Sequence, residues 1–302
     1  MKLISYMPNE NSISEFSQCT EKFGDLNLDG IETIIGDYCP IEVYETLPIK
    51  GVHLIYFPTW LEFWQEKVVN CYSFTKKQEM IDCFKKQFEL AKKFEVEYMV
   101  FHVSHVKSQD IFTMEFEYSD ENVFDATLEI INEVFTGDGP TLLFENLPWP
   151  GLNFRNYGAT KNFFEAVNYK NKGFTFDFSH FMCLNKDISN FDEAADFILQ
   201  EIPKLKDLKN HIYGIHLNAS ISKDYLSQDF TPLLEKWESS ERKDQYYIES
   251  NHIKNIDTHS IFASKKLRDV LKEIPYKYIT FELEHKSLKD LLDKVKIQSE
   301  YF

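Results

Sequence analysis

The chain has 302 residues, of which 43% are hydrophobic and 27% are charged, and its formal net charge is −16. This composition is that of a globular protein and excludes the disordered and fibrous classes. The acidic balance argues against a nucleic-acid partner, because duplex DNA is bound largely through Lys and Arg side chains that neutralise phosphates.

The cysteines and the N-terminal residues indicate the cellular compartment in which the protein is expected. Five cysteines are scattered without a CxxC pair, which argues against both a disulfide framework and a thiolate zinc site. The N-terminal MKLISYMPNE has no apolar segment ahead of a cleavage site, and no run of about 18 apolar residues follows. We therefore expect a cytoplasmic protein with no membrane partner.

Short apolar runs rich in β-branched and aromatic residues predict eight strands. In chain order they span residues 2–7, 30–36, 50–57, 97–103, 141–146, 173–178, 212–218 and 278–284. Amphipathic periodicity predicts helices at 76–94, 119–135, 159–167, 191–202, 258–274 and 287–298, with weaker patterns before the second and third strands. Two long loops are expected, over 57–74 and 219–257.

The order of these elements indicates the fold. Strands that are apolar on both faces and alternate with helices predict a parallel sheet covered by helices. Eight such units fit a (β/α)₈ TIM barrel better than an open doubly wound sheet. No repeat, low-complexity tract or linker interrupts the series, so we expect one α/β domain over 1–302.

Polar side chains recur at or near the C-terminal ends of six consecutive predicted strands. These residues are His53, His102, Glu145 with Asn146, Asp177 followed by His180, His216 with Asn218, and Glu282. In a barrel those ends converge on the face that carries active sites. Imidazoles and carboxylates are ligands of zinc, manganese and iron, and bound metal offsets the cost of burying them. The pattern therefore predicts a metal site at the barrel mouth.

The second long loop ends in a further pair. Asp257 and His259 lie two residues apart, so on an extended segment their side chains point the same way. A structural interpretation remains open for individual residues: Glu145 could be an ion-paired carboxylate under a loop, and Asp257 could be the N-cap of the predicted helix that follows it.

The motifs GVHL, FHVS, FENLPWPG, DFSH, GIHLNAS, DTH and FELE resemble, in this order, those of the xylose-isomerase-like barrel superfamily, specifically its endonuclease IV branch. That branch holds three zinc ions, and the resemblance covers essentially the whole chain. It implies that His53, His102 and Glu145 hold one metal. It implies further that Glu145 bridges to a second metal, which is held with Asp177, His216 and Glu282. The third metal would be held by His180, Asp257 and His259. The resemblance also implies catalytic roles for Glu145, Glu282 and Asp177.

The loops depart from the DNA-repair members, because they offer acidic and aromatic rather than basic residues. The aromatic residues Phe57, Trp60, Phe63 and Trp64, with Trp149 nearby, either belong to the core or cap a pocket for a bulky ligand. This region resembles the cobamide-remodelling phosphodiesterases, which cut a phosphoester in the nucleotide loop of corrinoid cofactors. The expected substrate contacts are His105, Asn146, Trp149, Asn218, Trp60 and Trp64.

Two classes of enzyme are compatible with these residues. The first is a zinc-dependent phosphodiesterase, with up to three Zn²⁺, acting on a small-molecule phosphoester such as a cobamide. The second is a sugar isomerase or epimerase that uses one Mn²⁺ or other divalent ion held by Glu145, Asp177, His216 and Glu282. The second leaves the other candidate ligands without a role. A ligand-binding protein without activity is a third alternative, which the complete ligand set disfavours.

Overall fold

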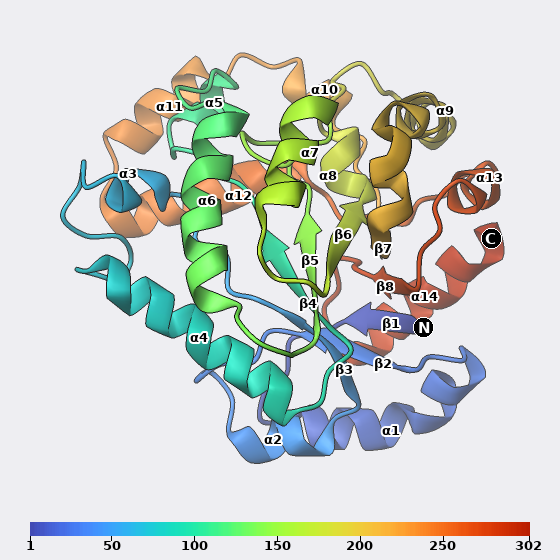
Figure 1. The fold of residues 1–302 in the computed structure, drawn as a ribbon. Helices are drawn as coiled ribbons and strands as arrows, with labels where there is room; N and C mark the ends of the chain where they lie inside the picture. Colours follow the sequence, from blue (N-terminus) through green and yellow to red (C-terminus); the bar gives the residue numbers. More distant parts are fainter.

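Eight parallel strands close into a barrel in the order of the chain in the computed structural model, which describes residues 1–302 (Figure 1). The strands are β1 (Lys2–Ser5), β2 (Gly30–Thr33), β3 (Ile49–His53), β4 (Tyr98–His102), β5 (Thr141–Glu145), β6 (Lys172–Asp177), β7 (Ile212–Leu217) and β8 (Tyr278–Phe281). β8 pairs with β1, so no sheet edge is left open. The predicted single (β/α)₈ barrel is confirmed.

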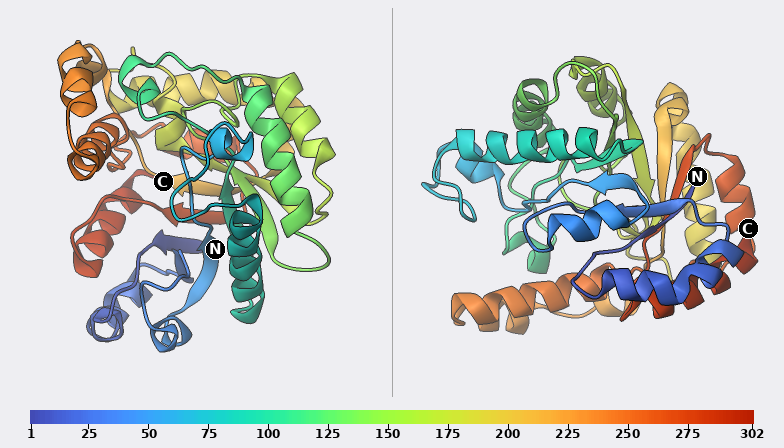
Figure 2. Two further views of the ribbon diagram at one scale, coloured as in Figure 1. Left: turned by 90° about the vertical axis from the view of Figure 1, so that its left-hand side faces the viewer. Right: turned by 90° about the horizontal axis from the view of Figure 1, so that it is seen from below.

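Two sets of helices surround the strands (Figures 1 and 2). The outer ring contains α1 (Ser12–Asp25), α2 (Ile41–Thr46), α4 (Lys77–Lys93), α6 (Asp120–Val134), α7 (Tyr157–Ala166), α9 (Phe191–Glu201), α13 (Leu267–Lys272) and α14 (Leu288–Gln298). Helices of the connecting segments are α3 (Leu61–Trp64), α5 (Asp110–Thr113), α8 (Phe178–Met182), α10 (Lys223–Leu226), α11 (Thr231–Glu238) and α12 (Arg242–Ile256). Two 3₁₀ helices, η1 (Ile202–His211) and η2 (Ser299–Tyr301), complete the chain. None of its helices combines the length and apolar character needed to cross a membrane.

The longer outer helices have one apolar face, and a side chain caps the N-terminus of α6, α7, α9 and α14. In α4, Met80, Ile81, Phe84 and Phe88 are buried against the barrel at the spacing of a helical stripe. Helix α6 begins after Ser119, whose hydroxyl accepts a hydrogen bond from the Asn122 backbone N–H at 3.3 Å. These helices enclose the apolar core between the ring and the strands.

Polar groups occupy part of the barrel interior. A side chain at Gly51 would collide with the ring of Tyr98, so this glycine leaves the space that Tyr98 fills. The Tyr98 hydroxyl donates a 2.6 Å hydrogen bond to Oε2 of Glu32 on β2. A buried carboxylate is thereby held beneath the barrel mouth.

The segment between β7 and β8 differs from the prediction. The expected loop 219–257 contains α10, α11 and α12, and α11 packs on α12 (orange in Figure 2). The expected helix 258–274 is wrong over its first half, and only α13 forms. There the chain returns to the mouth, pairs Ser260 with Ala219, and places His259 at φ 44°, which a helix cannot contain.

Candidate metal centre

The candidate ligands lie at or near the C-terminal ends of the strands, at the mouth of the barrel. His53, His102, Glu145 and Asp177 are the last residues of β3, β4, β5 and β6. His216 is the penultimate residue of β7, Glu282 directly follows β8, and His180 lies on α8. Asp257 and His259 follow α12, where Asp257 is a C-cap rather than the N-cap considered above.

Three groups of side chains bring their ligand atoms within 4.8 Å of one another. The groups are His53, His102 and Glu145; Glu145, Asp177, His216 and Glu282; and His180, Asp257 and His259. Glu145 belongs to two of them and is fully buried. All nine residues that the sequence singled out as ligands are therefore assembled, in the grouping that the resemblance implies.

In the first group, two ring nitrogens and one carboxylate oxygen converge. Nε2 of His53 and Nε2 of His102 lie 3.2 and 2.9 Å from Oε2 of Glu145, and 3.2 Å from each other. Nδ1 of His53 donates to the Leu54 carbonyl at 2.9 Å, so Nε2 is the ring nitrogen that faces the carboxylate. Either a proton on Nε2 or a metal cation between the two atoms makes this close approach favourable.

The second group is the most buried. Nδ1 of His216 lies 2.9 Å from Oε2 of Glu282 and 3.1 Å from Oε1 of Glu145. On the other side of the ring, Nε2 lies 3.0 Å from Oε1 of Glu32. When Nε2–H faces Glu32, the Nδ1 lone pair faces the carboxylates, as in the carboxylate–histidine arrangement that supports metal ligands.

The third group joins the barrel to the segment after α12. Oδ2 of Asp257 lies 3.1 Å from Nε2 of His180 and 2.8 Å from Nε2 of His259. Nδ1 of His180 faces the Asn146 carbonyl at 2.9 Å, which directs Nε2 toward Asp257. Oδ1 of Asp257 accepts hydrogen bonds from the hydroxyls of Ser179 and Ser220, so only Oδ2 is left for a cation.

The electrostatics of the centre favour cations. Burial would raise the pKa of Glu145, but His216 and His102 outweigh it and hold the pKa well below its usual range. Burial lowers the pKa of His259, but the Asp257 carboxylate outweighs burial and raises the pKa to about 10. Glu145 is thus ionised, and a proton on His259 balances the Asp257 carboxylate when no metal does so.

These residues fit divalent metal ions. Oε2 of Glu282 and Nδ1 of His102 are buried and have no hydrogen-bond partner. Oε2 of Glu282 nevertheless lies 2.9 Å from a ring nitrogen, a contact that two ligands of one cation make. Nitrogen and oxygen donors without thiolates suit zinc and manganese.

Comparison with known proteins defines the family. Residues 44–300 match the xylose isomerase-like TIM barrel family, which is more than half of the chain. The chain belongs to this family. A comparison with curated protein sequences gave no significant match.

Solved structures share the xylose isomerase-like barrel at low identity. A D-tagatose 3-epimerase-like protein has a TM-score of 0.56 and 16% identity, covering 99% of this chain and 96% of that one. Endonuclease IV from Thermus thermophilus has a TM-score of 0.56 and 13% identity, covering 99% and 98%. The IOLI protein with a bound zinc atom has a TM-score of 0.54 and 18% identity, covering 100% and 99%. These similarities establish the fold alone.

The predicted substrate contacts are placed differently from the predicted ligands. Asn146 and Asn218 are fully buried. Asn146 exchanges two hydrogen bonds with the Asp177 backbone, and Asn218 donates to Oδ2 of Asp177 at 2.8 Å. In this xylose isomerase-like barrel the two amides therefore position the candidate ligand Asp177, and a substrate contact by either amide remains a prediction.

The aromatic residues of the first long loop belong to the core. Trp60 and Trp64 are buried, and their indole N–H groups donate to the Ser104 carbonyl and to Oε2 of Glu129. His105 is also buried, and burial lowers its pKa to about 4. Trp149 is buried against Phe116. None of these four side chains belongs to the three groups of candidate ligands, and the substrate contacts expected of them remain predictions.

Glu32 is a candidate functional residue that sequence reasoning missed. It is fully buried, and besides His216 and Tyr98 it accepts a hydrogen bond from the Thr280 hydroxyl at 3.2 Å. A signal was present, because GIETIIG places one acidic residue inside an apolar strand, the same anomaly that identified Asp177.

A pocket of about 420 Å³ opens onto the first two groups. His53, His102 and Glu282 form its floor. Its walls come from the ends of β1 to β3 and carry no Lys or Arg: Ser5, Tyr6, Met7, Thr33, Ile34, Tyr38, Leu54, Ile55 and Tyr56. We term this space the catalytic pocket.

Proposed function

We propose that the protein is a metal-dependent hydrolase that cleaves a phosphodiester in a small organic substrate. The observation that carries the proposal is that two histidine-rich groups adjoin the four-ligand group. The first of them shares Glu145 with the four-ligand group. The other is linked to it through His180, whose Nδ1 lies 3.2 Å from Oε1 of Glu145. Clusters of two or more divalent ions are characteristic of enzymes that displace groups at phosphorus.

The charge balance supports a phosphodiester. Four carboxylates face the centre, from Glu145, Asp177, Asp257 and Glu282. Three divalent cations would leave two positive charges, which match a monoanionic phosphodiester and one hydroxide. A single cation among the three carboxylates of the inner group would leave the site negative, which favours a neutral substrate. Because the catalytic pocket has no cationic side chain, any phosphate charge must be balanced by metal.

The roles of the residues follow from their positions. Bound cations would supply an ionised water near neutral pH and positive charge for the phosphoryl oxygens. Glu145 would hold two of the sites together, and His216 would be oriented by Glu32. Glu282, at the floor of the catalytic pocket, would hold a cation through Oε2, and its other carboxylate oxygen would accept the proton of the attacking water. The water oxygen bonds to phosphorus, one P–O ester bond breaks, and the leaving alcohol takes the proton.

A cobamide is the specific substrate that we propose, on the basis of the sequence resemblance to cobamide-remodelling phosphodiesterases. Support comes from the acidic surface, which disfavours nucleic acid, and from a catalytic pocket walled by tyrosine, methionine and isoleucine side chains. Incubation of cobalamin with the zinc-loaded protein, followed by chromatography, should reveal cleavage within the nucleotide loop. An intact cofactor after prolonged incubation would remove this substrate.

Metal content together with a generic substrate tests the broader proposal. Protein prepared with zinc should contain up to three zinc ions per chain by elemental analysis and should hydrolyse bis(p-nitrophenyl) phosphate. Glu145→Gln protein, prepared in the same way, is the matched control and should be inactive. Wild-type protein that binds three ions yet cleaves neither this diester nor a cobamide would contradict the proposal.

A sugar isomerase or epimerase is the second candidate. One specific observation favours it: the group formed by Glu145, Asp177, His216 and Glu282 is complete by itself and is the most deeply buried. A D-tagatose 3-epimerase-like protein also shares the fold. One Mn²⁺ per chain, with interconversion of ketohexoses and no phosphodiester cleavage, would place this function first.

A further inference from the structure

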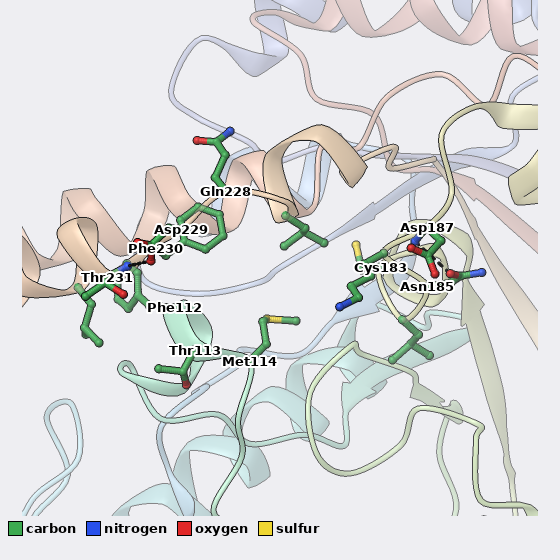
Figure 3. Close-up of a pocket in the computed structure, with 14 residues that line it drawn as sticks. Phe112, Thr113, Met114, Cys183, Asn185, Asp187, Gln228, Asp229, Phe230 and Thr231 are labelled. Carbon is green, nitrogen blue, oxygen red and sulfur yellow. Dashed lines mark hydrogen bonds between the residues drawn. The ribbon is translucent and has the colours of Figure 1, made fainter.

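A second pocket is larger than the catalytic pocket, and none of the candidate ligands lines it (Figure 3). Its volume is about 610 Å³, within the range of small-molecule sites. We term it the outer pocket. Its walls come from α5, the segment after α8, and α10 and α11: Phe112, Thr113, Met114, Cys183, Leu184, Asn185, Lys186, Asp187, Leu226, Gln228, Asp229, Phe230, Thr231 and Leu234.

The outer pocket is held open by a buried histidine of α12. Nε2 of His252 faces the Ile111 carbonyl at 2.9 Å, and its Nδ1 faces the Tyr225 hydroxyl at 2.8 Å. The His252 ring also stacks on Phe112 with centroids 4.7 Å apart. One side chain therefore fastens two walls of the pocket, α5 and α10, to α12.

The inner wall of the outer pocket adjoins the third group of candidate ligands. The thiol of Cys183 lines the pocket and donates to the Ile256 carbonyl at 3.4 Å. Ile256 directly precedes Asp257, and Cys183 directly follows the helix that carries His180. Cys183 is thus shared by the outer pocket and the surroundings of Asp257. The catalytic pocket reaches the centre through a different set of residues, His53, His102 and Glu282.

The lining indicates the kind of group that fits. Phe112, Met114, Leu226, Phe230 and Leu234 offer apolar surface, whereas Asn185 and Gln228 offer amides. Lys186 is accompanied by Asp187 and Asp229, so the pocket presents no net positive charge to an anion. A sugar would leave much of this volume empty and would bury few of its hydroxyls against partners. A ring system that is largely apolar and carries uncharged polar substituents matches both the size and the chemistry.

We propose that the outer pocket binds a bulky, uncharged, ring-bearing half of the phosphodiester substrate while the phosphorus lies at the centre. This inference rests on the proposed hydrolase function and adds a specificity site to it. The residues that discriminate between substrates are then Leu226, Phe230 and Leu234 on α10 and α11, which lie outside the barrel strands.

The test compares two diesters that release the same chromophore. These are p-nitrophenyl 1-naphthyl phosphate, which has a ring for the outer pocket, and p-nitrophenyl methyl phosphate, which has none. We expect kcat/KM to be at least about tenfold higher for the naphthyl ester, the scale of a well-filled apolar pocket. Leu234→Glu should abolish this preference and leave kcat/KM for the methyl ester unchanged. Leu233→Glu makes the same change at the neighbouring half-buried position outside the pocket and should retain the preference.

A binding measurement separates failure of the subsite from failure of the hydrolase function. Titration calorimetry with 1-naphthol, which has no phosphate, should detect binding to the wild type and to Leu233→Glu, but not to Leu234→Glu. If neither diester is cleaved but this pattern is seen, the hydrolase function fails and the ring-binding pocket stands. If both diesters are cleaved equally well by the wild type and by Leu234→Glu, the outer pocket has no part in substrate selection.

Discussion

Nε2 of His216 lies 3.0 Å from Oε1 of Glu32, so a carboxylate on β2 orients the histidine of β7 across the barrel. Glu32→Gln keeps an acceptor for the ring N–H but removes the charge. We expect metal affinity to fall about 10- to 100-fold, the usual effect of losing such a partner. Competition with a chromogenic chelator measures it. Tyr98→Phe removes the hydrogen bonds of the Tyr98 hydroxyl to Glu32 and Thr280 but keeps the carboxylate, so it is the control and should have a smaller effect. Equal metal affinity in the wild type and in Glu32→Gln would dismiss this role.

Glu145→Gln tests the side chain shared by two groups. The amide has a similar shape, but both sites lose a negative charge that compensates cations. Phosphodiesterase activity should fall by at least about a hundredfold, the scale on which one electrostatic stabiliser acts. Steady-state kinetics with bis(p-nitrophenyl) phosphate provide the measurement. Activity within a few-fold of the wild type would show that Glu145 does not bridge two metal ions.

His259→Ala and His180→Ala test the third group. Each variant removes one of its three ligands but leaves Glu145, Asp177, His216 and Glu282 intact. We expect loss of one metal per chain by elemental analysis and loss of hydrolysis. If both variants keep full metal content and full activity, the trinuclear arrangement is wrong, and the isomerase function, which needs only the inner group, takes first place.

Stability of the metal-free protein should depend on pH. The pKa of His259 is raised to about 10 from its usual 6.5, so its pairing with Asp257 stabilises the fold fully below pH 6.5 and loses that effect as pH rises through about 10. The melting temperature of metal-free protein should therefore fall between pH 7 and pH 10, whereas zinc-loaded protein should change less. Metal should displace the proton, so zinc affinity should rise over the same interval. A melting temperature independent of pH in the metal-free state would be inconsistent with this pairing.

The acidic surface predicts weak interaction with DNA. With a net charge of −16, we expect no stable binding of duplex DNA at about 0.15 M salt, where phosphate contacts are already weakened. Electrophoretic mobility shift with an abasic-site duplex is a direct measurement, with the same duplex lacking the lesion as control. Efficient incision of the abasic duplex by the pure protein would establish a repair activity instead.

The barrel and the assembly of the ligand residues could be predicted because they depend on local patterns. Each buried strand is a short apolar run, and an acid or histidine at the end of such a run stands out. The predicted strands nevertheless extended too far, as in 50–57, where the strand ends at His53. Beyond His53 the chain remains apolar because it lines the catalytic pocket. Amino-acid composition does not distinguish a segment that lines a pocket from a strand that pairs in a sheet.

Other features depend on contacts that composition does not reveal. Helix α12 was missed because its faces are mixed: Tyr246 and Tyr247 are exposed, whereas His252 is buried. The sequence left open whether Trp60 and Trp64 belong to the core or to a pocket, because an aromatic cluster has the same composition in a core and in a pocket wall. Glu32 was missed because its partners, on β4, β7 and β8, are distant in sequence.

The third group also has a consequence for how the segment after β7 is fastened. His180 belongs to α8 at the barrel mouth, whereas Asp257 and His259 belong to the return from α12. A cation shared by them is a cross-link between two parts of the chain, and its binding energy adds to the stability of their contact by mass action. Withdrawal of that ion by a chelator would then loosen α11 and α12 before it affects the barrel, and protection of their amides from hydrogen exchange would report the loss.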